Sequence, residues 1–112
     1  MKTWILRFRA RDRKNFEEVR RGLKIVETRA ATERYRKIQA GDQLVFVCGR
    51  ARLAKLVKRS KHFDSIGAMF RAVGYKKIMP SASSAIEVRK IYYGYPGYKE
   101  KIRKFGIVVF WI

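Results

Sequence analysis

The residues from Gly106 to Ile112 place the strongest constraint on the fold, because every residue after the glycine is apolar. A short, continuous apolar run is typical of a strand that is covered on both faces, so we expect a central strand there. Between Trp4 and Arg9 every second residue is a large apolar one, as a half-buried strand requires. If strands so far apart in sequence share one core, a sheet that closes or nearly closes is the simplest arrangement.

Capping residues and glycines predict helices between these two strands. Residues 15–22 begin with Asn15 as a cap and end in a glycine, and residues 65–74 also end in a glycine. Residues 84–94 begin with the S-x-x-E spacing of a capping box. A further helical turn is expected within residues 32–38.

The remaining segments are extended in character. Residues 24–28 are rich in β-branched side chains, and residues 43–48 and 52–59 flank a Gly-Arg pair, which predicts a hairpin. No repeat or low-complexity linker interrupts the pattern. We therefore predict a single α+β domain over residues 1–112, a mixed β-barrel of about five to six strands with inserted short helices.

Charge indicates the class of partner. The chain has 28 Lys and Arg against 9 Asp and Glu, for a formal net charge of +19. Such a charge opposes folding by self-repulsion unless a polyanion or salt screens it, and nucleic acid is the obvious polyanion. The alternative is a generally basic, solvated surface. Because the basic residues are spread along the whole length, they do not form a separate tail.

Apolar length and cysteine content indicate the compartment. The longest apolar stretches, residues 44–48 and 107–112, are far too short to cross a bilayer. The single cysteine, Cys48, cannot form an internal disulfide, which agrees with a reducing compartment. We expect a cytoplasmic protein, monomeric and without a cofactor.

Two short motifs resemble a known family. The run from Gly22 to Arg29 reads G-x-K-x-x-E-x-R, and Gly41-Asp42 leads into an apolar strand. Their order and separation resemble the ASCH family, and the helix near Ser65, the Pro80-Ser81 segment and the apolar final strand also fit. The resemblance spans nearly the whole chain. It implies a β-barrel related to the PUA domain, with a groove facing residues 24–29 and an RNA ligand.

The same resemblance raises an enzymatic alternative. Some ASCH-like members are small amidohydrolases that remove an acyl group from modified cytidine with a Lys, a Thr and a Glu. Lys24 matches the Lys, whereas Glu27 stands in place of the Thr, and residues 76–79 offer no acid. Other members are ribonucleases or nonspecific nucleic-acid binders.

Lys24, Glu27 and Arg29 are the predicted cleft residues. Lys24 could act as a base or nucleophile if burial lowered its pKa, but structural pairing or phosphate contact is the favoured interpretation. Glu27 could accept a hydrogen bond from the amino group of cytosine or guanine, or it could anchor Arg29.

Further basic and aromatic residues are candidates for contacts outside the cleft. The predicted phosphate contacts are Arg50, Arg52, Lys55, Lys58, Arg59 and Lys61. Tyr93, Tyr95 and Tyr98 are interleaved with cations and could stack on unpaired bases, whereas Tyr92 is expected to face the core. Core packing is the alternative for Tyr93, Tyr95 and Tyr98.

Other chemistry receives little support. His62 is the only histidine, Cys48 lies in an apolar strand, and no residues have metal-ligand spacing. Ser81, Ser83 and Ser84 are expected to serve a turn and a helix start, although amides there could hold a phosphate. The sequence thus predicts an RNA-binding protein, with RNA preferred to DNA and with ribosome or tRNA association. An adaptor on the ribosome or on an anionic membrane surface is a third alternative.

Overall fold

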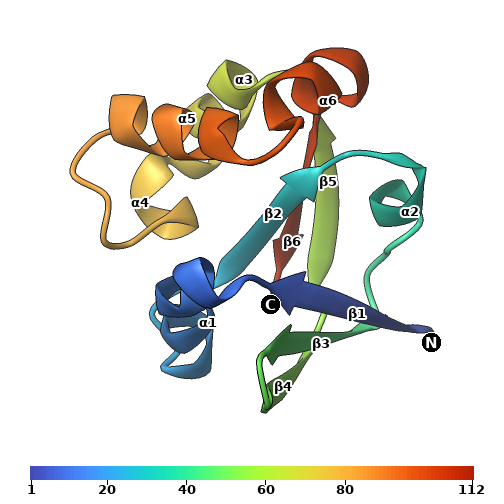
Figure 1. Cartoon of the computed structure of the whole chain (residues 1–112). Coiled ribbons are helices and arrows are strands. Elements are labelled where there is room, and N and C mark those ends of the chain that lie inside the picture. The colour runs from blue at the N-terminus through green and yellow to red at the C-terminus, as the bar shows by residue number, and fades with distance from the viewer.

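Six strands form two three-stranded sheets in the computed structural model, which describes residues 1–112 (Figure 1). The first sheet has the order β1-β3-β4, with strands Thr3–Phe8, Gln43–Cys48 and Ala51–Leu56. The second has the order β2-β6-β5, with strands Val26–Ala30, Ile107–Trp111 and Arg59–Phe63. β1 runs parallel to β3, and every other pair is antiparallel. The final strand is central in its sheet, as its apolar sequence predicts.

The sheets are joined on one side only. β4 passes into β5 through Val57 and Lys58, whose backbone amides donate to Asp42 (2.8 Å) and Trp111 (2.7 Å) in the neighbouring chain segments. At the opposite side, β1 and β2 are both edge strands, and no backbone hydrogen bonds pair them. The α+β class and the number of strands agree with the prediction. The strands do not form a closed barrel, because this seam between β1 and β2 stays open.

Helices cover the second sheet and flank the first. α3 (Ile66–Val73), α4 (Tyr75–Ile78), α5 (Ala85–Gly94) and α6 (Tyr98–Phe105) lie together on one side of the second sheet (Figure 1). The short helix η1 (Ala10–Asp12) and α1 (Arg13–Arg20) follow β1, and α2 (Glu33–Arg36) follows β2. None of these helices has the length and apolar character needed to cross a bilayer.

The core has two parts because the second sheet buries both of its faces. Ile107 and Val109 of β6 pack with α3 to α6, including Met69 and Tyr92. Val108 and Phe110 face the other way, toward side chains of the first sheet and α1. Alternate residues of β6 therefore face the two core parts, which explains why the strand is apolar throughout.

Helix capping follows the sequence in two of the three predicted cases. The Ser65 side chain accepts from the amide of Ala68, and Ser84 accepts from the amide of Glu87, both at 3.1 Å. The predicted Asn15 cap is wrong, since α1 begins earlier and Asn15 lies within it. The predicted strand over residues 52–59 is also interrupted, because the chain bends between β4 and β5.

Candidate ligand-binding pocket between β1 and β2

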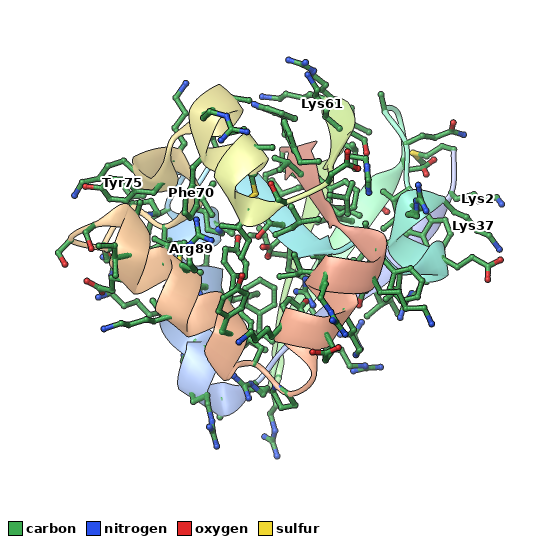
Figure 2. All side chains as sticks on the ribbon, turned by 90° about the horizontal axis from the view of Figure 1, so that it is seen from above. Lys2, Lys37, Lys61, Phe70, Tyr75 and Arg89 are labelled. Carbon is green, nitrogen blue, oxygen red and sulfur yellow. The ribbon has the colours of Figure 1, made fainter.

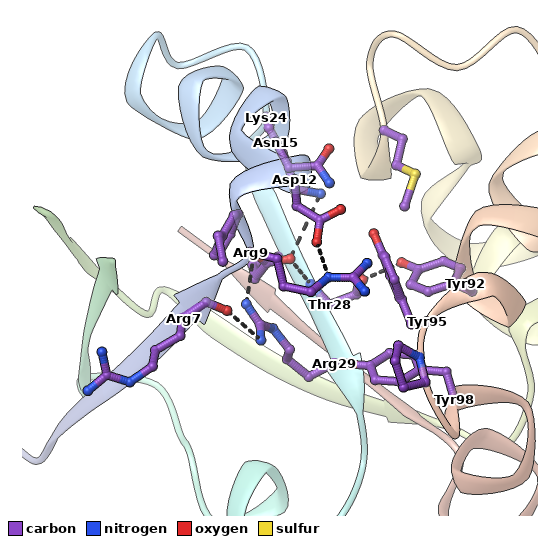
Figure 3. Close-up of a pocket in the computed structure, with 14 residues that line it drawn as sticks. Arg7, Arg9, Asp12, Asn15, Lys24, Thr28, Arg29, Tyr92, Tyr95 and Tyr98 are labelled. Carbon is purple, nitrogen blue, oxygen red and sulfur yellow. Dashed lines mark hydrogen bonds and ion pairs between the residues drawn. The ribbon is translucent and has the colours of Figure 1, made fainter. Parts of the chain in front are cut away.

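A pocket of about 200 Å³ opens at the seam between the two sheets (Figure 3). β1 and β2 form two of its walls, the start of α1 forms a third, and the segment linking α5 to α6 forms the fourth. Its lining residues are Arg7, Phe8, Arg9, Asp12, Asn15, Lys24, Glu27, Thr28, Arg29, Met79, Tyr92, Tyr95, Pro96 and Tyr98. The unpaired edges of the sheets therefore border a cavity that polar and aromatic side chains share.

Lys24 is buried beside the start of β2, with only 3% of the residue exposed. Its Nζ donates to the carbonyl oxygen of Ile78 and lies 4.0 Å from Oε1 of Glu27. Burial lowers the pKa of the Lys24 ammonium, and the carboxylates of Glu27 and Glu18 oppose that effect. The pocket therefore contains an amine that releases its proton more readily than an exposed lysine does.

Glu27 supplies the carboxylate of the pocket. Its Oε1 accepts from the backbone amide of Thr28 at 2.8 Å, and its Oε2 lies 3.8 Å from the guanidinium of Arg29. Because Glu27 and Arg29 are two residues apart on β2, both side chains point into the space between the sheets. The carboxylate is thus held between two cations, with acceptor capacity for a ligand donor.

Arg29 crosses the seam. One guanidinium nitrogen donates to the carbonyl oxygen of Arg7 on β1 at 3.4 Å, and the group lies 5.2 Å from the ring of Phe8 and 5.9 Å from that of Tyr35. These contacts link β2 to β1 where the backbone does not. Arg29 therefore positions Glu27 and also holds the two edge strands together.

Tyrosines make the wall opposite Glu27. The Thr28 hydroxyl is hydrogen-bonded to the hydroxyl of Tyr92, and burial raises the Tyr92 pKa well above its ordinary value. Burial likewise raises the pKa of Tyr95 to about 12 and raises that of Tyr98. The rings of Tyr95 and Tyr98 meet edge to face at 5.2 Å between centroids. The wall is therefore neutral, aromatic and rich in hydroxyl groups.

Arg9 and Asp12 occupy the mouth (Figure 3). Nε of Arg9 donates to Oδ2 of Asp12 at 2.7 Å, and the guanidinium lies 5.2 Å from the ring centroid of Tyr95. The Arg9 side chain stays 40% exposed. It thus presents a cation to solvent at the entrance while its position is fixed from two sides.

The structure brings together only part of the predicted site. Lys24, Glu27 and Arg29 all line the pocket, as do Tyr95 and Tyr98. Tyr93 does not; it is exposed on the outside of α5, with the Lys99 ammonium 5.6 Å from its ring. None of the predicted phosphate contacts lines the pocket: Arg50, Arg52, Lys55, Lys58, Arg59 and Lys61 lie on β4, β5 and their connections.

Several pocket residues have no clear sequence signal. Arg9, Asp12 and Met79 reach the pocket only because β1, α1 and the segment after α4 converge on β2. Tyr92 was expected in the core, and it is buried there, but its hydroxyl also reaches Thr28. Thr28 also lines the pocket, although strand alternation points its side chain to the opposite face of β2 from Glu27.

Cys48 and His62 lie outside the pocket. Cys48 is buried in β3, as expected for a thiol in an apolar strand. A ring nitrogen of His62 on β5 lies 2.7 Å from the carbonyl oxygen of Phe105. No group of three or more His, Cys, Asp or Glu side chains is placed to hold a metal ion. Ser81 bonds to the buried Glu18 carboxylate, and Ser83 bonds to Glu87.

Solved structures with a similar fold include the following two. One is the crystal structure of the hypothetical protein PH0355, with a TM-score of 0.83, 25% identity, and coverage of 97% of this chain and 95% of that one. The other is the solution structure of PF0455 from Pyrococcus furiosus, with a TM-score of 0.72, 25% identity, and coverage of 96% and 93%. No protein-family profile and no curated protein sequence matches the chain.

Proposed function

We propose that this chain is an RNA-binding domain of the ASCH type that takes one unpaired nucleotide into the pocket between β1 and β2. The observation that carries the proposal is the convergence of Lys24, Glu27 and Arg29 with the tyrosine wall in one cavity. The net charge of +19 supports a polyanionic ligand. RNA is favoured over DNA because unpaired bases, which such a pocket can receive, are the usual targets in RNA.

Each wall of the pocket has a part in this proposal. The Glu27 carboxylate accepts from the exocyclic amino group of cytosine or guanine. Tyr95 and Tyr98 offer ring surface against the base, and the exposed Arg9 contacts its phosphate. Lys24 and Arg29 hold Glu27 in place from opposite sides.

The strand order supports the PUA-like part of the proposal. Followed through the β4–β5 bend, the two sheets give the strand order β1-β3-β4/β5-β6-β2, an order that pairing of β1 with β2 would close into a barrel. The pocket lies at that seam, beside the segment that carries the G-x-K-x-x-E-x-R motif. An RNA ligand also agrees with a cytoplasmic monomer that associates with tRNA or the ribosome.

Replacing Glu27 by Gln tests the pocket. We expect Glu27→Gln to weaken binding of an unpaired oligocytidine by about tenfold, because a charge-assisted hydrogen bond is lost. Fluorescence anisotropy measures the affinity. The matched control is Glu33→Gln, since the Glu33 side chain on α2 is 87% exposed and lies outside the pocket.

Two further measurements are needed to interpret the affinity of the Glu27→Gln variant. Thermal melting confirms that Glu27→Gln is folded, because that change removes the carboxylate partner of a buried lysine. Wild-type affinity must also fall linearly with salt on logarithmic axes, as counterion release requires. Absence of a salt slope in the wild type, or equal affinity of the folded Glu27 variant, contradicts the proposal.

A second function is favoured by the buried amine. Lys24 has a lowered pKa and lies next to Glu27, so it could act as the base in hydrolysis of an acylated cytidine. The Thr28 hydroxyl, however, is engaged by Tyr92, and Met79 occupies the wall where an acid would be needed. Cleavage of the RNA backbone is the alternative reaction for the same site.

Incubation of the pure protein with N4-acetylcytidine distinguishes the enzyme from the binder. If the site is catalytic, acetate and cytidine form, and Lys24→Ala reduces the rate by two orders of magnitude or more, roughly the contribution of general base catalysis. Lys37→Ala is the matched control, because Lys37 is an exposed lysine directly after α2 and does not line the pocket. Product that does not depend on Lys24 rules out this role.

A further inference from the structure

The outer face of the first sheet has no covering element. Its inner face packs on α1 and the second sheet through Leu6, Phe46 and their neighbours. The opposite side chains belong to alternate residues: Thr3, Ile5 and Arg7 on β1, Gln43, Val45 and Val47 on β3, and Arg52, Ala54 and Leu56 on β4. In Figure 1, α3 to α6 all lie beyond the second sheet, away from this face.

Strand register sorts this face into rows. Arg7 pairs with Val47, which pairs with Arg52, so two exposed arginines flank one valine. Val47 is only 6% exposed although no helix covers it. Its register partners Arg7 and Arg52 have long aliphatic stems that can cover it while their charged ends stay in solvent.

The next row is apolar, since Ile5 pairs with Val45 and Val45 with Ala54. The row beyond it is mixed: Thr3 and Gln43 are polar, and Leu56 is apolar and 54% exposed. Neither Arg7 nor Arg52 has an ion-pair partner. The face therefore has unpaired positive charge at one end, an apolar row beside it, and a mixed row with Thr3, Gln43 and Leu56 at the far end.

Arg7 connects this face to the pocket. Its carbonyl oxygen accepts from Arg29 at the pocket wall, whereas its guanidinium points away from the cavity (Figure 3). The alternation of β1 requires this, since Leu6 and Phe8 point inward. A chain leaving the pocket mouth on this side reaches the Arg7 and Arg52 row first.

We propose that the RNA chain flanking the pocket nucleotide crosses the outer face of the first sheet, with successive phosphates on Arg7 and Arg52. This inference rests on the proposed function and assigns the path that the RNA takes outside the pocket. The positive charge of Arg7 and Arg52 favours the RNA backbone, a polyanion, as the molecule that covers this face. A second copy of the chain would set the same arginine row against itself or against another part of a protein of charge +19.

The test is the salt dependence of binding by Arg7→Gln/Arg52→Gln to an unpaired oligocytidine. Loss of two phosphate contacts lowers the slope of log affinity against log salt by about 1.4, and lowers affinity in dilute salt by about tenfold. Arg36→Gln/Arg71→Gln is the matched control. Both of those arginines are exposed, have no ion-pair partner, and lie on α2 and α3.

The pocket variant separates this inference from the function on which it rests. Glu27→Gln lowers affinity with the slope unchanged, whereas the Arg7 and Arg52 double variant lowers the slope. An unchanged slope in the double variant, or the same reduction in the control, overturns the path while the pocket proposal stands. A wild type without RNA affinity overturns both. Competition by polyglutamate as effective as by RNA overturns the path in favour of an acidic protein partner.

Discussion

The pocket residues show how burial sets the chemistry of single side chains. The same desolvation lowers the pKa of Lys24 and raises those of Tyr92, Tyr95 and Tyr98, because in each case the charged form is penalised. Glu27 is the nearest charge to Lys24 and moderates the effect. The site thus sets neutral tyrosine hydroxyls beside one carboxylate that Lys24 and Arg29 flank, which suits a hydrogen-bonded ring better than a bare anion.

The effect of burial on Tyr95 can be measured. Its pKa is raised to about 12 in the folded protein, against about 10 in an unfolded chain. Its contribution to stability is therefore complete below pH 10 and is lost as the pH rises through about 12. We expect Tyr95→Phe to reduce the fall in stability over that interval, measured by denaturant unfolding at each pH. Tyr93→Phe is the control, since Tyr93 is exposed, and an equal change in both variants contradicts the assignment.

Local pattern predicted residues that belong to one short segment. Lys24, Glu27 and Arg29 lie within six residues, and alternation along β2 puts Glu27 and Arg29 on one face, which a sequence motif can express. Arg9 and Tyr95 meet at 5.2 Å although they are far apart in sequence. No periodicity encodes that contact, because it depends on how β1 and the α5–α6 connection approach the same edge.

The strands and helices that were not predicted are mainly the polar ones. The strand β5 reads Arg-Ser-Lys-His-Phe, and only Phe63 is buried, so apolar alternation is absent. The helix α6 was not predicted either, although Tyr98, Ile102 and Phe105 recur on one face and glycines stand at both ends. The apolar strands β3 and β6 were predicted correctly, because burial on both faces or one leaves a clear pattern.

Gly106 joins α6 to β6 and permits no side chain. Its φ is +81°, and an added Cβ would lie 2.4 Å from the carbonyl oxygen of Phe63 and 2.6 Å from Nε2 of His62. We expect Gly106→Ala to lower the free energy of unfolding by about 3 kcal/mol, because both the backbone and β5 must shift. Chemical denaturation measures the change.

Gly94 provides the matched control at the end of α5. An added Cβ there meets nothing within 4 Å, and the backbone is helical. Gly94→Ala is expected to be neutral or to stabilise by up to about 1 kcal/mol. Equal stability of the two variants would show that the joint before β6 is not constrained as described.

At the scale of the whole molecule, charge and shape carry different information. Basic side chains project on all sides, with Lys2 and Lys37 on one side and Lys61 and Arg89 elsewhere (Figure 2). The net charge of +19 therefore predicts affinity for polyanions in general, which the composition alone indicates. Selection among them has to come from the pocket, whose position depends on the open side of the strand arrangement and was not readable from composition.

The bond from Arg29 to the Arg7 carbonyl has a mechanical consequence. At every other junction of the strand arrangement, separation would break a backbone ladder or the β4–β5 chain itself. Between β1 and β2, separation breaks this 3.4 Å hydrogen bond, the 2.7 Å bond from Arg34 after β2 to the Ile5 carbonyl oxygen on β1, and side-chain packing. We therefore expect the molecule to be most compliant where its cavity lies, and we expect ligands bulkier than an unmodified base to enter without loss of sheet structure.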